Sequence, residues 1–248
     1  MDSHAVIWEE LKFFVNALKC LQVSTSLELS EKTLCVSTGT YSENWVYCPE
    51  DITNPEDVKK AVKFFRERDE EFMWPVYSEG REVLESAGLI YAGDLAAMSL
   101  EPDSVNIIDD RPDVKIYRTN NPEEWAMTSW LGFGGSDEDF PENYRVFVKA
   151  LSEQRENVSL YSAKYEGKNA GVFLLTNEAE FTGVYYFAVV PEFRRQGIAC
   201  AMMNEICRLS GGKKIVLQST PMGEKFYRNY GFRELFRMPV YSTEEDIF

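Results

Sequence analysis

Residues 184–199 constrain the fold of this chain more than any other segment. They read VYYFAVVPEFRRQGIA: an apolar run that predicts a buried strand, a turn that begins at Val-Pro, and then the start of a helical pattern. Backbone N–H groups at a turn entering a helix bind anions. Gly197 lets an anion approach the main chain because it lacks a Cβ, and Arg194 and Arg195 add donors suited to phosphate. The segment therefore predicts a diphosphate site between a strand and a helix.

The spacing of this segment excludes two common nucleotide motifs. The chain has no G-x-x-x-x-G-K-[ST] and no G-x-G-x-x-G after a strand. Residues 194–199, RRQGIA, instead resemble the acyl-CoA motif R/Q-x-x-G-x-G/A of the GNAT family of N-acetyltransferases. Residues 227–232, YRNYGF, resemble that family's Y-x-x-x-G-F element. The two motifs occur in the family's order, and the resemblance extends over residues 112–240.

The apolar pattern predicts an α/β (α+β) fold. From residue 114 onward it predicts a strand, two helices, three strands, a helix, a strand, a helix and a final strand. The first of these helices is expected to open at Asn121-Pro122. The turn at residues 167–169 is expected to join two of the strands as a hairpin. The GNAT resemblance implies that these strands form a mixed sheet, splayed at its centre and flanked by helices.

The N-terminal part is expected to form a smaller α/β domain. We predict domains at 1–110 and 111–248, with the polar segment 101–112 as linker. The first has a helical pattern at 5–21 and strand patterns at 33–37, 45–48, 72–77 and 89–100, with helices from Asn54 and over 80–87. The glycine spacing 80–88 echoes 223–231, which indicates either a degenerate GNAT-like half or a chance match between glycine-capped helices.

Composition limits the partners that the chain can have. Its net charge of −15 over 248 residues argues against nucleic acid and anionic membranes as partners, and it would attract a cationic amine. The N-terminus does not resemble a signal peptide, and no apolar run is long enough for a membrane span, so we expect a cytoplasmic protein. Five cysteines without a C-x-x-C and one histidine predict no metal site. The oligomeric state stays open.

The family resemblance implies that acetyl-CoA is the acyl donor. The main chain of residues 195–200 is expected to bind its diphosphate, and the end of the preceding strand its pantetheine arm. Thr220 stands where many relatives have an Asn that contacts this arm. The predicted cofactor-binding residues are Phe187, Ala188, Val189, Arg194, Arg195, Gln196, Gly197, Ile198, Ala199, Cys200 and Thr220.

The same resemblance assigns the catalytic residues. Tyr227 matches the family tyrosine that acts as general acid on the leaving thiolate. Some relatives place a glutamate base where this chain has Gly183, so Glu180 is the predicted base, with the acidic loop residues as alternatives. By resemblance, the acceptor pocket includes Trp130, Phe133, Asp137 and Asp139.

The predicted function is transfer of an acetyl group from acetyl-CoA to a primary amine, on a small molecule or a peptide. Direct attack of the amine on the thioester is the expected route. Two alternatives stay open. The acyl group could be another one, or the chain could be an acyl-CoA-binding sensor or scaffold without catalysis, since the strand glutamate is missing and the N-terminal half carries no readable chemistry.

Overall fold

The computed structural model describes residues 3–40, 43–50, 54–77, 81–101 and 111–244, which divide into two compact units. The first comprises Met1–Met98, Gln218–Asn229 and Arg233–Phe248, and the second Ser99–Leu217 and Tyr230–Phe232. This division differs from the predicted domains 1–110 and 111–248 because strand β11 (Arg233–Ser242), near the C-terminus, pairs with β4 (Trp74–Pro75). The two domains as sequence units stay a prediction, and most of the predicted linker lies outside the described residues.

The second unit contains a mixed sheet with the strand order β10-β9-β8-β7-β6. Its strands are β6 (Val114–Arg118), β7 (Val158–Tyr165), β8 (Lys168–Thr176), β9 (Phe181–Val189) and β10 (Lys214–Ser219). All neighbours are antiparallel except β9 and β10, which are parallel. The predicted α/β fold with a mixed sheet is confirmed.

The sheet is splayed between β9 and β10, as the resemblance implied. The two strands pair at three positions, from Lys214↔Phe181 to Val216↔Gly183. The pairing of β9 with β10 ends at Gly183, although β9 continues to Val189. The end of β9 therefore leaves the ladder on the β10 side while it stays paired with β8, for example at Gly171↔Val189.

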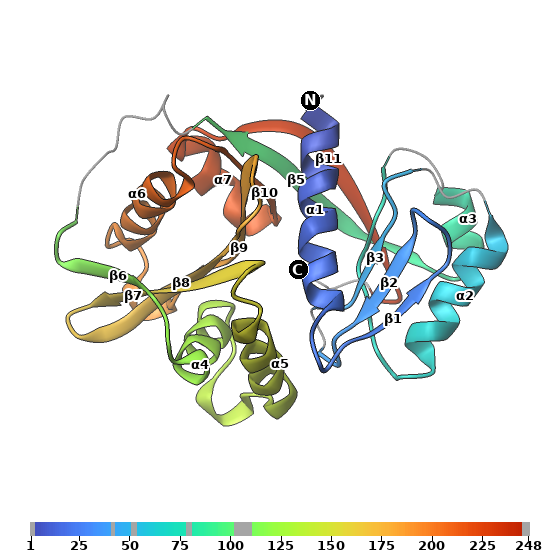
Figure 1. Ribbon diagram of the computed structural model, residues 1–248, viewed down its shortest axis with the longest axis horizontal. Coiled ribbons are helices and arrows are strands. Elements are labelled where there is room, and N and C mark those ends of the chain that lie inside the picture. Colours follow the sequence, from blue (N-terminus) through green and yellow to red (C-terminus); the bar gives the residue numbers. More distant parts are fainter. Residues whose placement is uncertain (1–2, 41–42, 51–53, 78–80, 102–110, 245–248) are drawn as a thin grey trace. The chain divides into compact units, whose positions relative to one another are not determined.

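Three helices cover the two faces of this sheet (Figure 1). Helices α4 (Pro122–Gly132) and α5 (Glu142–Glu153) lie on one face, and α6 (Ile198–Ser210) lies on the other. Helix α4 starts where the sequence predicts, because the Asn121 side chain accepts a hydrogen bond from the N–H of Glu124 (3.2 Å) and Pro122 occupies the first turn. Helix α6 ends at Gly211, whose φ of 62° is left-handed.

The hairpin between β7 and β8 is confirmed, but its turn lies one residue earlier than predicted. Tyr165 pairs with Lys168, so Glu166 and Gly167 form the turn. Both have positive φ, 50° and 79°, which is the conformation of a type I′ turn. A type I′ turn requires two adjacent left-handed residues, and the Glu-Gly pair meets this requirement.

The first unit contains helices, an antiparallel sheet of short strands and a second group of paired strands. Its helices are α1 (Ser3–Lys19), α2 (Pro55–Arg66), α3 (Arg81–Ser86) and α7 (Pro221–Tyr230). The antiparallel sheet consists of β1 (Thr25–Glu28), β2 (Leu34–Ser37) and β3 (Trp45–Tyr47), and in the second group β4, β11 and β5 (Ile90–Leu100) are neighbours in that order. Strand β1 was not predicted, because its side chains are mostly exposed and show no buried alternation. The predicted strand at 72–77 is reduced to the two residues of β4.

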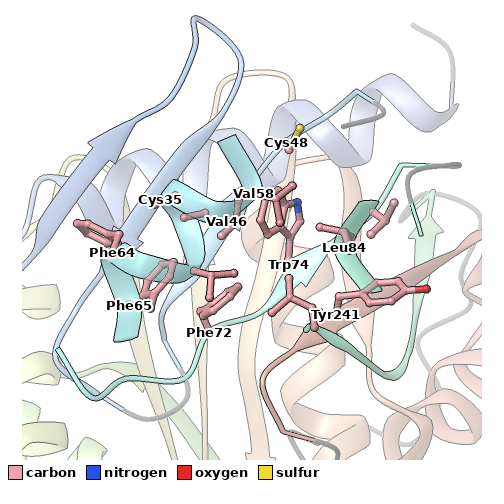
Figure 2. Packing of buried hydrophobic residues seen from close by; sticks show 14 residues of the cluster. Cys35, Val46, Cys48, Val58, Phe64, Phe65, Phe72, Trp74, Leu84 and Tyr241 are labelled. Carbon is pink, nitrogen blue, oxygen red and sulfur yellow. The ribbon is translucent and has the colours of Figure 1, made fainter. Parts of the chain in front are cut away.

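Aromatic side chains dominate the core of this unit (Figure 2). Phe65 of α2 stacks on Phe72 with ring centroids 4.3 Å apart, and Phe72 lies beside Trp74 of β4. Tyr241 of β11 joins the same cluster, so a residue near the C-terminus completes the N-terminal core. Burial of such large side chains contributes roughly 1.5–3 kcal/mol each.

Candidate cofactor and active site

The predicted diphosphate segment forms a turn with open main-chain donors. A 3₁₀ turn at Pro191–Phe193 follows β9, and Gly197, with φ of 78°, is the N-cap of α6. Among the described residues, no side chain caps this helix start. No described residue accepts a hydrogen bond from the main-chain N–H groups of residues 195–199. These N–H groups, at the positive end of a helix dipole, fit a diphosphate.

The two arginines of the motif have different surroundings. Arg194 is held by the protein: its Nε donates to the carbonyl of Val189 (3.1 Å) and its Nη2 to the carbonyl of Gly132 (2.8 Å). It therefore ties the turn to the end of β9 and to the end of α4. Arg195 is exposed, and no described residue forms an ion pair with its guanidinium, so its charge is available to a ligand. Gln196 bonds the carbonyl of Glu192 through its side-chain amide (3.0 Å).

The end of β9 carries a β-bulge where the predicted pantetheine-binding residues lie. Leu174 pairs with Tyr185 and Val172 with Ala188, so Phe173 of β8 faces two residues of β9. Tyr186, one of the two, has a φ of 51°. The bulge thus includes Phe187 and redirects the main chain before Ala188 and Val189, which fits a strand that turns polar main-chain groups toward an extended ligand.

Two glycines hold Ala188 in place from both sides. A Cβ at Gly132 of α4 would lie 2.7 Å from the Ala188 Cβ. A Cβ at Gly171 of β8 would lie 2.7 Å from the Ala188 carbonyl oxygen and 2.8 Å from Met202 Sδ. Such distances leave no room for a methyl group, so these glycines set how closely α4, β8 and α6 approach β9.

Tyr227 and Thr220 lie together in the first unit. Tyr227 packs over Gly223, where a Cβ would be 2.9 Å from the tyrosine ring and 2.8 Å from Ser219 Oγ. Burial raises the pKa of Tyr227 well above its ordinary value, so its phenol stays protonated at neutral pH. The Thr220 carbonyl accepts hydrogen bonds from Ser219 Oγ (2.8 Å) and from the N–H of Gly223 (3.0 Å). Tyr230, the other tyrosine of the motif, donates its hydroxyl to Asn204 Oδ1 (2.7 Å).

The predicted acceptor residues separate into loop-forming and exposed groups. Asp139 Oδ1 accepts hydrogen bonds from the Ser136 N–H (2.7 Å), the Ser136 hydroxyl (2.8 Å) and Trp130 Nε1 (3.1 Å). The bonds from Ser136 lower the pKa of Asp139, as does, to a lesser extent, the bond from Trp130. Asp139 and Trp130 therefore close the loop. Asp137 is exposed, and Phe133 presents 62% of its surface to solvent beside Gly132.

The structure does not favour Glu180 as the base. Glu180 is exposed and precedes the first residue of β9, and its N–H donates to Glu178 Oε2 (2.5 Å). Eight residue steps of extended strand separate Phe181 from Val189, which is roughly 26 Å. Glu180 thus lies at the end of β9 opposite the diphosphate segment, and its role as the base stays an untested prediction.

Arg111 is a residue of this site that the sequence did not indicate. Its guanidinium donates to the carbonyl of Gln196, 85 positions along the chain. In the sequence it stands inside a polar segment typical of a linker, and no local pattern links it to Gln196. Within the described residues, no cluster of His, Cys, Asp and Glu is suited to hold a metal ion. None of the described helices is long and apolar enough to cross a membrane.

Comparison with known proteins shows what this chain is similar to. Residues 133–242 match the family model described as acetyltransferase (GNAT) domain. A GCN5-related N-acetyltransferase from Kribbella flavida is similar in fold, with a TM-score of 0.66 and 14% identity over 97% of this chain and 95% of that one. A putative GNAT-family acetyltransferase from Novosphingobium aromaticivorans has a TM-score of 0.59 and 14% identity, over 95% of both chains.

The likeness in fold extends to the N-terminal half. A tandem GNAT protein from the clavulanic acid biosynthesis pathway has a TM-score of 0.60 and 11% identity, over 93% of this chain and 86% of that one. At such identities the likeness concerns the fold alone. No match was found among the curated proteins compared.

Proposed function

We propose that this chain, whose residues 133–242 form an acetyltransferase (GNAT) domain, is an acyl-CoA-dependent N-acetyltransferase that moves an acetyl group to a primary amine. One observation carries the proposal: the N–H groups of residues 195–199 are open at the start of α6, directly after a strand that has left its neighbour β10. An acyl-CoA needs both features, a site for its diphosphate and a strand that diverges from its neighbour beside the peptide-like arm.

The diphosphate would bind to the main chain of residues 195–200. Gly197 adopts the left-handed φ that the turn into α6 requires, and the exposed Arg195 adds a charge. Arg194 would stabilise the turn that forms this site, since its guanidinium donates to two carbonyls of the protein. The amides of the pantetheine arm would bind the main chain of residues 187–189, with Thr220 as a further contact.

Bound acetyl-CoA supplies a thioester whose acyl carbon is open to attack by a neutral amine. The leaving sulfur is stabilised by a proton donor, and Tyr227 is the proposed one. Its raised pKa keeps a hydrogen on the phenol oxygen, so that it donates a hydrogen bond at neutral pH. An ionised tyrosine would repel the thiolate instead.

The acceptor would be a small-molecule or peptide amine. A net charge of −15 favours the approach of a cationic amine, and the exposed Asp137 and Phe133 offer it a charge and an apolar surface. Such an amine must lose a proton before attack. The exposed Asp137 is the better candidate to accept this proton, because Asp139 Oδ1 already accepts hydrogen bonds from Ser136 and Trp130.

The test is release of thiol from acetyl-CoA in the presence of an amine library, together with the dissociation constant for CoA. We expect that the chain binds CoA and that release of thiol depends on one class of amine. Binding without turnover on any amine would favour the sensor or scaffold instead, an alternative that the placement of Glu180 keeps relevant. Absence of CoA binding would refute the cofactor site itself.

A further inference from the structure

Arg111 lies against the diphosphate segment although nothing in its sequence context indicates this. It precedes β6, and its Nη1 donates to the carbonyl of Gln196. A Cβ at Gly197 would lie 3.1 Å from the same nitrogen. The guanidinium is therefore in direct contact with the peptide unit that joins Gln196 to Gly197.

Neighbouring side chains hold the guanidinium in this position. Its Nε and Nη2 donate to the two carboxylate oxygens of Asp113 at 2.8 and 2.6 Å. The ring of Tyr165 lies beneath it, with Cζ 5.4 Å from the ring centroid. The bidentate pair lowers the pKa of Asp113, so both partners stay charged at neutral pH. Arg111 is thus fixed in orientation before any ligand binds.

The contact decides which way one peptide unit faces. In a trans peptide the C=O of one residue and the N–H of the next point in opposite directions. Because Arg111 holds the Gln196 carbonyl, the Gly197 N–H points away from Arg111. Without this contact, glycine would permit the peptide to rotate, since it tolerates both signs of φ. In a rotated peptide, a carbonyl oxygen would replace the N–H donor that faces the anion.

We propose that Arg111 is a positioning residue for the acyl-CoA site, which locks the Gln196–Gly197 peptide with its N–H directed at the diphosphate. The inference rests on the cofactor binding of the proposed function and does not depend on catalysis. It predicts that Arg111 contributes to the affinity for the part of the ligand that carries phosphate and does not contribute to the affinity for the pantetheine arm.

The experiment compares Arg111→Met with Arg111→Lys by calorimetry, with CoA and with pantetheine, which has the arm and thiol but no diphosphate. Met keeps an apolar stem and removes every donor, whereas Lys retains one donor for the carbonyl. We expect Arg111→Met to raise the Kd for CoA roughly ten-fold, the effect of one lost well-placed hydrogen bond. Arg111→Lys should recover part of this loss, and the Kd for pantetheine should not change.

Arg118→Met is the matched control. Arg118 is an exposed arginine on β6 whose guanidinium bonds only the carbonyl of Arg155 (3.4 Å) among the described residues. The Arg118→Met variant should bind CoA with the Kd of the wild type. A positioning role also leaves the slope of log Kd against log salt concentration unchanged, because Arg111 does not itself neutralise a phosphate.

Three results would overturn the inference: wild-type affinity of Arg111→Met for CoA, an equal loss of CoA and pantetheine binding, or no rescue by lysine. A wild-type chain that binds CoA but acetylates no amine would refute the proposed enzyme and leave the role of Arg111 supported. A wild-type chain that binds no CoA would overturn both.

Discussion

Replacing Gly197 with alanine tests the diphosphate site most directly. Gly197 has a φ of 78°, in the left-handed region, where a Cβ costs about 1–2 kcal/mol. For a chain of this size that strain lowers the melting temperature by roughly 2–8 °C. The added Cβ would also lie 3.1 Å from Arg111 Nη1, the nitrogen that donates to the Gln196 carbonyl, and would press on that contact.

The effect on the ligand follows from the Gln196–Gly197 peptide, whose N–H is no longer held toward the ligand when the methyl group displaces Arg111 Nη1. A hydrogen bond to a charged group contributes about 1.5–3 kcal/mol, so loss of one such bond raises the Kd for CoA by roughly 10- to 150-fold. The assay is calorimetric titration with CoA, combined with thermal unfolding of the same samples.

Gly211→Ala is the matched control at the other end of the same helix. Gly211 also has a left-handed φ, 62°, and a Cβ there would meet no atom within 4 Å. Both variants should therefore lose similar stability, but Gly211→Ala should bind CoA with unchanged affinity. Equal affinity of both variants for CoA, with equal losses of melting temperature, would show that the diphosphate binds elsewhere.

Three further substitutions test the remaining parts of the site. Tyr227→Phe should lower kcat roughly 10²-fold with an unchanged Kd for CoA, and an unchanged kcat would remove Tyr227 from the mechanism. Because burial raises the pKa of Tyr227, ionisation of this tyrosine should not lower the wild-type kcat below pH 10. Asp139, whose pKa is lowered, stabilises the loop above the ordinary carboxyl pKa of about 4, and this contribution is lost as the pH falls through the lower folded value. The indole N–H resonance of Trp130 should therefore shift at low pH in the wild type, and Asp139→Asn should abolish this shift. Gly171→Ala places a methyl group 2.7 Å from the Ala188 carbonyl and should cost about 1–3 kcal/mol in thermal unfolding, so an unchanged melting temperature would contradict the close packing at β9.

The local features of the site could be predicted from the sequence. The turn after β9 and the helix that begins at Ile198 both depend on residues within one short segment. Hydrogen bonds and φ preferences act between neighbours, so the contiguous residues contain the information. The same holds for α4, whose Asn-Pro start was predicted and is observed with its side-chain cap.

The partners of these local features could not be predicted. The sequence offered Arg194 and Arg195 as donors for phosphate without distinguishing them, and only the structure shows that the guanidinium of Arg194 bonds the carbonyls of Val189 and Gly132. The acidic loop suggested free carboxylates, but Asp139 closes that loop on Ser136 and Trp130. A side chain's choice among such acceptors depends on which of them the packing brings within reach.

By itself the sequence determined the order of strands and helices from residue 114 onward and the turn that leads from β9 into α6, because periodicity and turn chemistry act over a few neighbouring residues. Only the tertiary structure decided that β11 completes the core of the first unit with β4, that β9 leaves β10 after Gly183, and that Arg111 holds a peptide 85 positions away. These contacts join residues with no shared local pattern, and they arise when the sheet and its helices pack as a whole.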